Sequence, residues 1–207
     1  MPPFKERHIR YLERCKQPFW QNVFHLEIEY LIEHLQGCRD ILSVGCGPAT
    51  IEGELAKHGF HVTGLDISHE ALSCAPDRIR KVVGRAEDMA FPRHSFDAVI
   101  YVASLQFVDD YRTALDKSAA VVRPGGRLVV MLLNPASAFF QKKQADPASY
   151  IASLKHPDLA AIQSKASEHF LVRGEYYLRI DGDQVEAGGK EPDSALFIIS
   201  GTKRAEP

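Results

Sequence analysis

The chain has 207 residues, 45% hydrophobic and 25% charged, the composition of an ordinary globular domain. A formal net charge of -2 gives no bulk electrostatic reason to expect nucleic acid or an anionic membrane as a partner, so a small molecule is the simpler expectation. No apolar run approaches the ~20 residues of a membrane span, and the charged start, MPPFKERHIRYLERCK, is unlike a signal peptide, which favours a cytoplasmic protein.

The first 37 residues are predicted to be helical, either as an amphipathic pair or as one helix broken near Pro18, with a stop at Gly37. From residue 38 to 135, short apolar runs alternate with helical stretches, as expected for a parallel sheet with crossover helices. Strands are predicted near 40–44, 60–66, 80–84, 96–102 and 127–133. Between them, Gly59 is expected to end one helix, Ser68 to cap the next, and Asp109 or Asp110 to cap a third.

Residues 136–170 have the composition of a helical insertion, with Pro147 and Pro157 as predicted helix starts. The tail contains two further strand patterns, at 170–180 and 194–203, joined by a polar, Gly-rich loop. Because no helix separates these two strands, we expect them to be antiparallel neighbours.

The stretch ILSVGCGPATIEGEL, residues 41–55, predicts a strand that ends in Gly-x-Gly just before a helix. Such a turn directs free backbone N–H groups toward one spot and lets a ligand approach closely. Asp66 follows Gly47 by 19 residues at the end of the second strand, where a carboxylate can accept both hydroxyls of a ribose. Two ligand classes fit: a nicotinamide dinucleotide, or a nucleoside with a non-phosphate tail. Thr50 stands where a dinucleotide site has its third glycine, which favours the second class.

Four stretches in this order, ILSVGCGPA, VTGLDIS, GRAEDMAFPRHSFDAVI and RPGGRLVVM, resemble the class I S-adenosylmethionine-dependent methyltransferases, especially the type 11 small-molecule branch. The resemblance implies an α/β fold: a Rossmann-like, doubly wound, seven-stranded sheet that is mostly parallel, with an antiparallel last strand and helices on both faces. It also implies a single domain over 1–207. Its parts would be a helical lid at 1–37, a cofactor-binding core at 38–135, a helical insertion at 136–170 and a strand pair at 171–207.

The resemblance also implies the residues that hold S-adenosylmethionine. The methionine and ribose would lie along Gly45, Cys46 and Gly47, the ribose hydroxyls on Asp66, and the adenine against Ile67. The remaining expected contacts are an amide and a carboxylate at the adenine edge and main-chain groups at the methionine amino end, from Ala86, Glu87, Tyr101 and Val102.

Three positions depart from the family pattern. Arg85 stands where relatives have an aspartate at the adenine edge, and arginine cannot accept a hydrogen bond from the adenine amino group. Ser43 stands where many relatives have an acid before the glycine loop, and Gln106 replaces a histidine after the fourth strand. Each change removes one of the family's usual polar groups from the site.

The function implied is methyl transfer to a small-molecule acceptor by in-line displacement, catalysed mainly by proximity and desolvation. This chemistry requires no fixed triad, so no catalytic residue is assigned. Groups that could orient the acceptor or serve as a base are Gln106, Asn134, Tyr150, His25 and Tyr11. An aromatic lid over the acceptor is predicted from Phe19, Trp20, Phe24, Phe139 and Phe140.

Two alternatives stay open at this stage: an NAD-type Rossmann oxidoreductase, and a non-catalytic module that binds S-adenosylmethionine. The sequence shows no metal-ligand spacing, so we expect no metal requirement. The four cysteines, at positions 15, 38, 46 and 74, are expected to be free thiols. The sequence does not indicate an oligomeric state.

Overall fold

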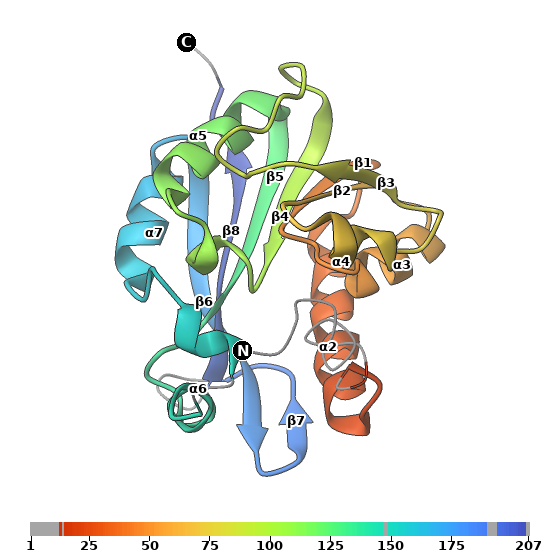
Figure 1. Cartoon of the computed structure of the whole chain (residues 1–207). Coiled ribbons are helices and arrows are strands. Elements are labelled where there is room, and N and C mark those ends of the chain that lie inside the picture. Colours follow the sequence, from red (N-terminus) through yellow and green to blue (C-terminus); the bar gives the residue numbers. More distant parts are fainter. Residues whose placement is uncertain (1–12, 14, 147–148, 190–193, 206–207) are drawn as a thin grey trace.

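A single mixed sheet organises the chain in the computed structural model, which describes residues 13, 15–146, 149–189 and 194–205 (Figure 1). Within that part of the chain the sheet has eight strands in the order β3-β2-β1-β4-β5-β8-β6-β7. The strands are β1 Asp40–Val44, β2 His61–Asp66, β3 Arg80–Val83, β4 Phe96–Val102, β5 Val122–Leu133, β6 Phe170–Asp181, β7 Gln184–Glu186 and β8 Ser194–Lys203.

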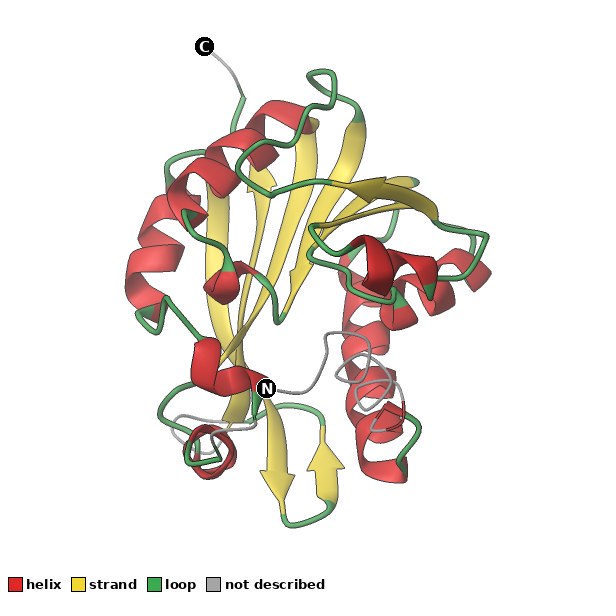
Figure 2. Ribbon diagram, viewed as in Figure 1, coloured by secondary structure: helices red, strands yellow, loops and turns green. Residues whose placement is uncertain are grey.

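Helices cover both faces of this sheet (Figure 2). Buried side chains of α2 (Pro18–His34) and α3 (Thr50–Lys57) pack on one face, and those of α5 (Tyr111–Val121) and α7 (Leu159–Ser167) on the other. The remaining helical elements among the described residues are α4 (His69–Ser73), α6 (Ala138–Gln144) and two 3-10 turns, η1 (Leu105–Phe107) and η2 (Tyr150–Ser153). None of the helices in the described ranges is long and apolar enough to cross a membrane.

The pairing pattern confirms the predicted fold class. Strands β3, β2, β1, β4 and β5 are mutually parallel, whereas β8 is antiparallel to both of its neighbours, β5 and β6. The expected count of seven strands is one too low. After β6, Gly182 adopts a positive φ of 59° and turns the chain so that Asp181 pairs with Gln184. This short hairpin adds β7 at the sheet edge, inside the stretch predicted to be a polar loop.

Helix boundaries follow the local sequence signals. Helix α2 begins at Pro18, where a missing N–H costs nothing. The Ser68 side chain accepts a hydrogen bond from Ala71 N at 3.0 Å and caps α4. Asp110 caps α5, so the second of the two predicted caps is the one used.

The segment 136–170 divides into two parts with different neighbours. Helix α7 packs on the sheet beside α5, and its Ile162 and Ala166 side chains are fully buried in the core. Its N-cap, Asp158, follows Pro157, in line with the predicted helix start; Pro147 lies outside the described residues. Helix α6 and η2 instead contact each other at the carboxyl end of the sheet. The segment thus supplies both a crossover helix and one wall of the ligand-binding edge.

Asp97 holds the starts of two strands together. One carboxylate oxygen accepts hydrogen bonds from Arg39 N at 2.8 Å and Asp40 N at 2.9 Å, and the other pairs with Arg123. Partial burial opposes ionisation, but these amide donors and the guanidinium outweigh it and lower the pKa of the Asp97 carboxyl.

We predict that Asp97→Asn lowers the free energy of unfolding by about 1–3 kcal/mol at pH 7, because charge-assisted hydrogen bonds are lost. Since the folded pKa is depressed, the contribution of Asp97 is present above its unfolded pKa of ~3.9 and disappears as the pH falls through the folded value. Urea unfolding at several pH values measures this. Asp77→Asn, at a fully exposed site, is the control and should change stability by less than ~0.5 kcal/mol. An equal loss of unfolding free energy in both variants would show that the hydrogen bonds and ion pair of Asp97 do not stabilise the fold.

Candidate cofactor and acceptor site

The glycine turn after β1 has a geometry that only glycine allows. Gly45 has a φ of 73°, and a Cβ built there would lie 2.5 Å from the Ser104 Cβ. The Ser104 hydroxyl is held in that position because it donates to Val44 O at 2.6 Å. The missing side chain therefore lets the β4–η1 connection pass directly over the turn.

Asp66 ties this turn to the end of β2. Its carboxylate accepts hydrogen bonds from Gly47 N at 2.7 Å and from Ser68 N at 2.8 Å. Gly45 N and Cys46 N both donate to Leu65 O. The amides of residues 45–47 are therefore all engaged within the protein, which corrects the expectation of free N–H groups at this turn.

A first cavity of about 400 Å³ lies beside Asp66. It brings together Gly45, Asp66, Ile67, Ala86 and Glu87, five of the residues expected to bind the cofactor. The Ile67 side chain is 65% exposed, so an apolar surface is open to a flat ligand. The volume is within the range of small-molecule sites.

Charged groups close one side of this first cavity. Arg85, the departure at the adenine edge, pairs with Asp109 and lies 3.6 Å from Glu87. Lys155 also pairs with Asp109. Hydrogen bonds from Lys155 and Arg85 lower the pKa of the Asp109 carboxyl to about 2. Glu87 Oε1 accepts from the amides of Asp109 and Asp110 at 2.9 and 3.0 Å. The Arg85 charge is thus met by acidic neighbours.

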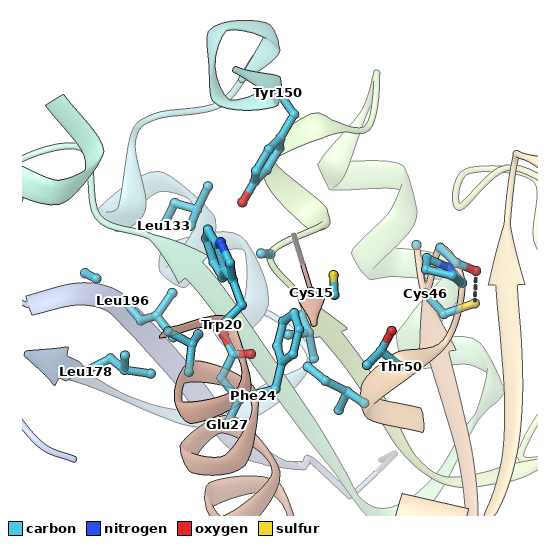
Figure 3. Close-up of a pocket in the computed structure, with 18 of the residues that line it drawn as sticks. Cys15, Trp20, Phe24, Glu27, Cys46, Thr50, Leu133, Tyr150, Leu178 and Leu196 are labelled. Carbon is cyan, nitrogen blue, oxygen red and sulfur yellow. Dashed lines mark hydrogen bonds between the residues drawn. The ribbon is translucent and has the colours of Figure 1, made fainter. Parts of the chain in front are cut away.

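A second cavity of about 410 Å³ lies between α2 and the carboxyl ends of the strands (Figure 3). Gly45, Cys46 and Gly47 form one end of it. Trp20, Phe24 and Glu27 project into it from one side of α2, and Tyr150 enters from the opposite side. The two cavities share Gly45 and Ala103, so they meet over the glycine turn.

Strand alternation separates the predicted pair Tyr101 and Val102. Val102 lines the second cavity. Tyr101 points to the other face of β4, where it is fully buried and its hydroxyl lies 2.7 Å from Ser118 Oγ. The Tyr101 side chain is therefore part of the core under α5, and the main-chain contact expected at this residue stays a prediction.

Glu52, on α3, is a site residue that sequence reasoning missed. It lines the second cavity and accepts a hydrogen bond from the Ser43 hydroxyl at 2.6 Å. Burial raises the pKa of Glu52 to about 7; the Ser43 hydrogen bond opposes this rise, and the nearby Asp66 adds to it. Helix α3 thus places the Glu52 carboxyl group beside Ser43, the position at the end of β1 where many relatives have an acid. A glutamate nine residues after a serine at this strand end was the available signal.

Glu27 is the second missed residue. It is 5% exposed on α2 and lines the second cavity. Burial, with a smaller contribution from Glu52, raises its pKa to about 8. Its sequence signal is an acid at a helical spacing of three and seven residues after Phe24 and Trp20, on the apolar side of the helix.

Of the four proposed orienting groups that the structure describes, only Tyr150 lines the second cavity. The Gln106 amide is fully buried and bonds the main chain of Leu133 in both directions, and Asn134 likewise binds main-chain groups. His25 is exposed and pairs with Glu29. These contacts engage the three side chains within the protein, and none of the three lines the second cavity, so a role for them as base or orienting group stays a prediction; Tyr11 lies outside the described residues.

None of the four cysteines forms a disulfide, and Cys15 and Cys46 line the second cavity. A group of possible metal ligands lies elsewhere. Asp116, Glu168 and His169 come close enough together to share an ion, which the sequence spacing did not predict. The Lys165 ammonium lies 2.6 Å from a carboxylate oxygen of Asp116 and 2.7 Å from one of Glu168. The lysine therefore already balances part of the negative charge of these two carboxylates.

Comparison with known proteins agrees with this geometry. Residues 42–130 match the family model of a methyltransferase domain. A demethylmenaquinone methyltransferase from Corynebacterium glutamicum is 38% identical over 91 residues, 44% of this chain and 40% of that protein. The O-methyltransferase rstn1 of Aspergillus nomiae is 33% identical over 114 residues, 50% of each chain.

Solved structures extend the likeness to the whole fold. A SAM-dependent methyltransferase from Thermotoga maritima superposes with a TM-score of 0.79 at 20% identity, covering 96% of this chain and 98% of that one. The N-methyltransferase NodS from Bradyrhizobium japonicum, solved with S-adenosyl-L-homocysteine, gives 0.67 at 16% identity, covering 93% and 91%. Residues 42–130 thus match a methyltransferase domain in sequence, and the chain as a whole shares the fold of solved S-adenosylmethionine-dependent methyltransferases. It spans half or less of the length of these two curated relatives.

We predict that Glu52→Gln stabilises the protein at pH 8. Because the folded pKa of about 7 lies above the unfolded value, ionisation of Glu52 costs stability as the pH rises from ~4.5 to 7, and glutamine removes that cost. The gain at pH 8 should be about 1–3 kcal/mol larger than at pH 5. Chemical unfolding at both pH values measures the difference. A gain that is independent of pH would contradict the assignment.

Proposed function

We propose that the protein transfers the methyl group of S-adenosylmethionine to a small-molecule acceptor. The carrying observation is that two cavities, each about 400 Å³ in size, meet over a turn that leaves no room for a side chain at Gly45. One cavity suits a nucleoside and the other an acceptor, so the turn between them is where the methyl group would cross. S-adenosylmethionine supplies that group already activated as a sulfonium.

In this proposal the first cavity holds the adenosine. Asp66 uses one acceptor site on each oxygen for Gly47 and Ser68, and the remaining lone pairs are available to the ribose hydroxyls. Ile67 offers its exposed face to the adenine ring. Ala86 and Glu87 lie in the same cavity and are the candidates for the adenine edge.

The amino end of the methionine would lie at Glu52. This carboxylate faces the cavity that contains the glycine turn, and Ser43 holds it through a hydrogen bond. An ammonium group beside Glu52 would favour its charged form and offset the cost of burying it. Where relatives have an acid at the strand end, this chain has Ser43, and the neighbouring Glu52 supplies the carboxylate near the turn instead.

The engaged amides argue against the dinucleotide alternative. A pyrophosphate needs free N–H donors at the turn, but those of residues 45–47 bond to Leu65 and Asp66. Thr50 also places a side chain where such sites have glycine. The second cavity favours an enzyme over a module that only binds the cofactor, because it offers an acceptor a place beside the turn.

Catalysis in this proposal rests on placement. The apolar walls of the second cavity exclude water, and the turn fixes the direction of approach. The acceptor named for the corynebacterial relative, demethylmenaquinone, is also a small molecule, which supports this acceptor class.

We predict that S-adenosylhomocysteine binds and NAD does not, and that Asp66→Ala weakens S-adenosylhomocysteine binding by about 1.5–3 kcal/mol through loss of charge-assisted hydrogen bonds. Isothermal calorimetry measures both. Asp77→Ala, at an exposed carboxylate on another part of the surface, is the matched control and should leave affinity unchanged. Equal affinity in the Asp66 variant and the wild type would remove the ribose assignment. Screening metabolite pools for a mass gain of one methyl group then tests turnover itself.

The predicted lid over residues 1–37 can include only part of α2. Tyr30, Leu31 and Leu35 are buried in the core, which anchors the second half of the helix, whereas Trp20 faces the cavity. Trp20 is the only tryptophan, so its emission reports on this end alone. We predict that saturating S-adenosylhomocysteine changes the emission by ordering the cavity wall. Unchanged emission, with binding proven by calorimetry, would mean that this wall is fixed.

A further inference from the structure

Aromatic rings form one end of the second cavity. The Trp20 ring centre lies 6.2 Å from that of Phe24 and 6.2 Å from that of Phe139. Much of the remaining wall is aliphatic, from Leu133, Leu178, Ile180 and Leu196. An acceptor that fits here must therefore have a largely apolar body.

Ionisation of the described lining residues can give this cavity only negative charge. Its described lining contains two carboxyl groups, those of Glu27 and Glu52, and no lysine, arginine or histidine. Glu27 lies on the same side of α2 as Trp20 and Phe24, so its carboxyl group is beside the aromatic end (Figure 3). Glu52 is bonded to Ser43 and lies with the glycine turn, which leaves Glu27 as the carboxyl group at the acceptor end.

We propose that the acceptor is an apolar amine whose nitrogen binds beside Glu27, and that the Glu27 carboxylate takes the proton that this nitrogen must lose. The inference rests on the methyl transfer proposed above and names the class of its acceptor. Aromatic faces and carboxylates both attract an ammonium ion, whereas a carboxylate or phosphate acceptor would find no cationic side chain in the described lining. A hydroxyl acceptor could bond to Glu27 but would gain nothing from the aromatic faces.

The proton and electron balance is complete without another reactant. The bound ammonium gives one proton to Glu27 and becomes a neutral amine with a free lone pair. That lone pair forms the new N–C bond to the methyl carbon while the C–S bond breaks and its electron pair stays on sulfur. The product leaves as a methylated ammonium ion, and Glu27 returns its proton to water. A carboxyl group with a pKa of about 8 is well matched to both steps near neutral pH.

The test uses three ligands that share a phenyl ring and differ in one polar group: phenethylamine, 2-phenylethanol and phenylacetate. Each is titrated into protein saturated with S-adenosylhomocysteine, with calorimetry and Trp20 emission as readouts. Phenethylamine should bind at least ~10-fold more tightly than either of the others, as expected for a charge-assisted contact. Glu27→Gln should weaken phenethylamine binding by ~10-fold and change 2-phenylethanol binding by less than ~2-fold. Glu29→Gln, on the exposed side of the same helix, should change neither.

The pH dependence of phenethylamine affinity is a further readout, and it would not change if Glu27 had only a structural role. The titratable groups facing Glu27 from the described elements are Glu52, Tyr150 and Tyr177, with Cys15 in the same cavity. Because Glu27 is protonated below pH ~8 when empty, ammonium binding must release its proton, so phenethylamine affinity should rise more than ~10-fold from pH 6 to 8. Glu27→Gln should largely flatten this rise.

The outcomes separate the two proposals. If phenethylamine binds no better than phenylacetate or 2-phenylethanol, or if Glu27→Gln leaves its affinity unchanged, the amine assignment is wrong. Failure of the methyl-transfer proposal would show earlier, as absence of S-adenosylhomocysteine binding before any amine is added. The ligand series and the pH series in the wild-type protein require no variant, so they decide the question even if Glu27→Gln does not fold.

Discussion

The hydrogen bond from Gly47 N to the Asp66 carboxylate is the contact on which the site depends. It joins the turn after β1 to the end of β2, and a second bond from Ser68 N fixes the same carboxylate. It acts together with the bonds from Gly45 N and Cys46 N to Leu65 O, so three amides of the turn are tied to the end of β2. Asp66 thus orders the protein scaffold before it contacts any ligand, and its remaining lone pairs face the first cavity.

Strand alternation then divides the surrounding residues between core and site. On β4 and β5, alternate side chains pack under α5 and α7 or toward α2 and α3. Tyr101 is on the first face and Val102 on the second, which is why one is core and the other lines the acceptor cavity. Glu27 and Glu52 come from the two helices on the cavity side, so both carboxyl groups lie there.

The strand and helix pattern could be predicted from sequence because periodicity and capping are local. The Pro18 helix start and the Ser68 cap are examples. The hairpin at Gly182 was missed because its flanking residues are polar and its pairing depends on the neighbouring strand. Glu27 was missed, and the main-chain bonds of Gln106 were not foreseen, for a different reason: whether a polar side chain bonds to the main chain or faces a cavity depends on distant segments. The turn amides, likewise, are engaged by β2, which local sequence does not show.

A crystal structure of the protein with S-adenosylhomocysteine tests the central claim most directly, because the claim is about which cavity holds which part of the ligand. We expect the adenosine in the first cavity with its ribose hydroxyls on Asp66, and the sulfur over Gly45 facing the cavity that contains Glu27. Adenosine bound elsewhere, or a sulfur that faces away from the second cavity, would contradict the assignment of the two cavities.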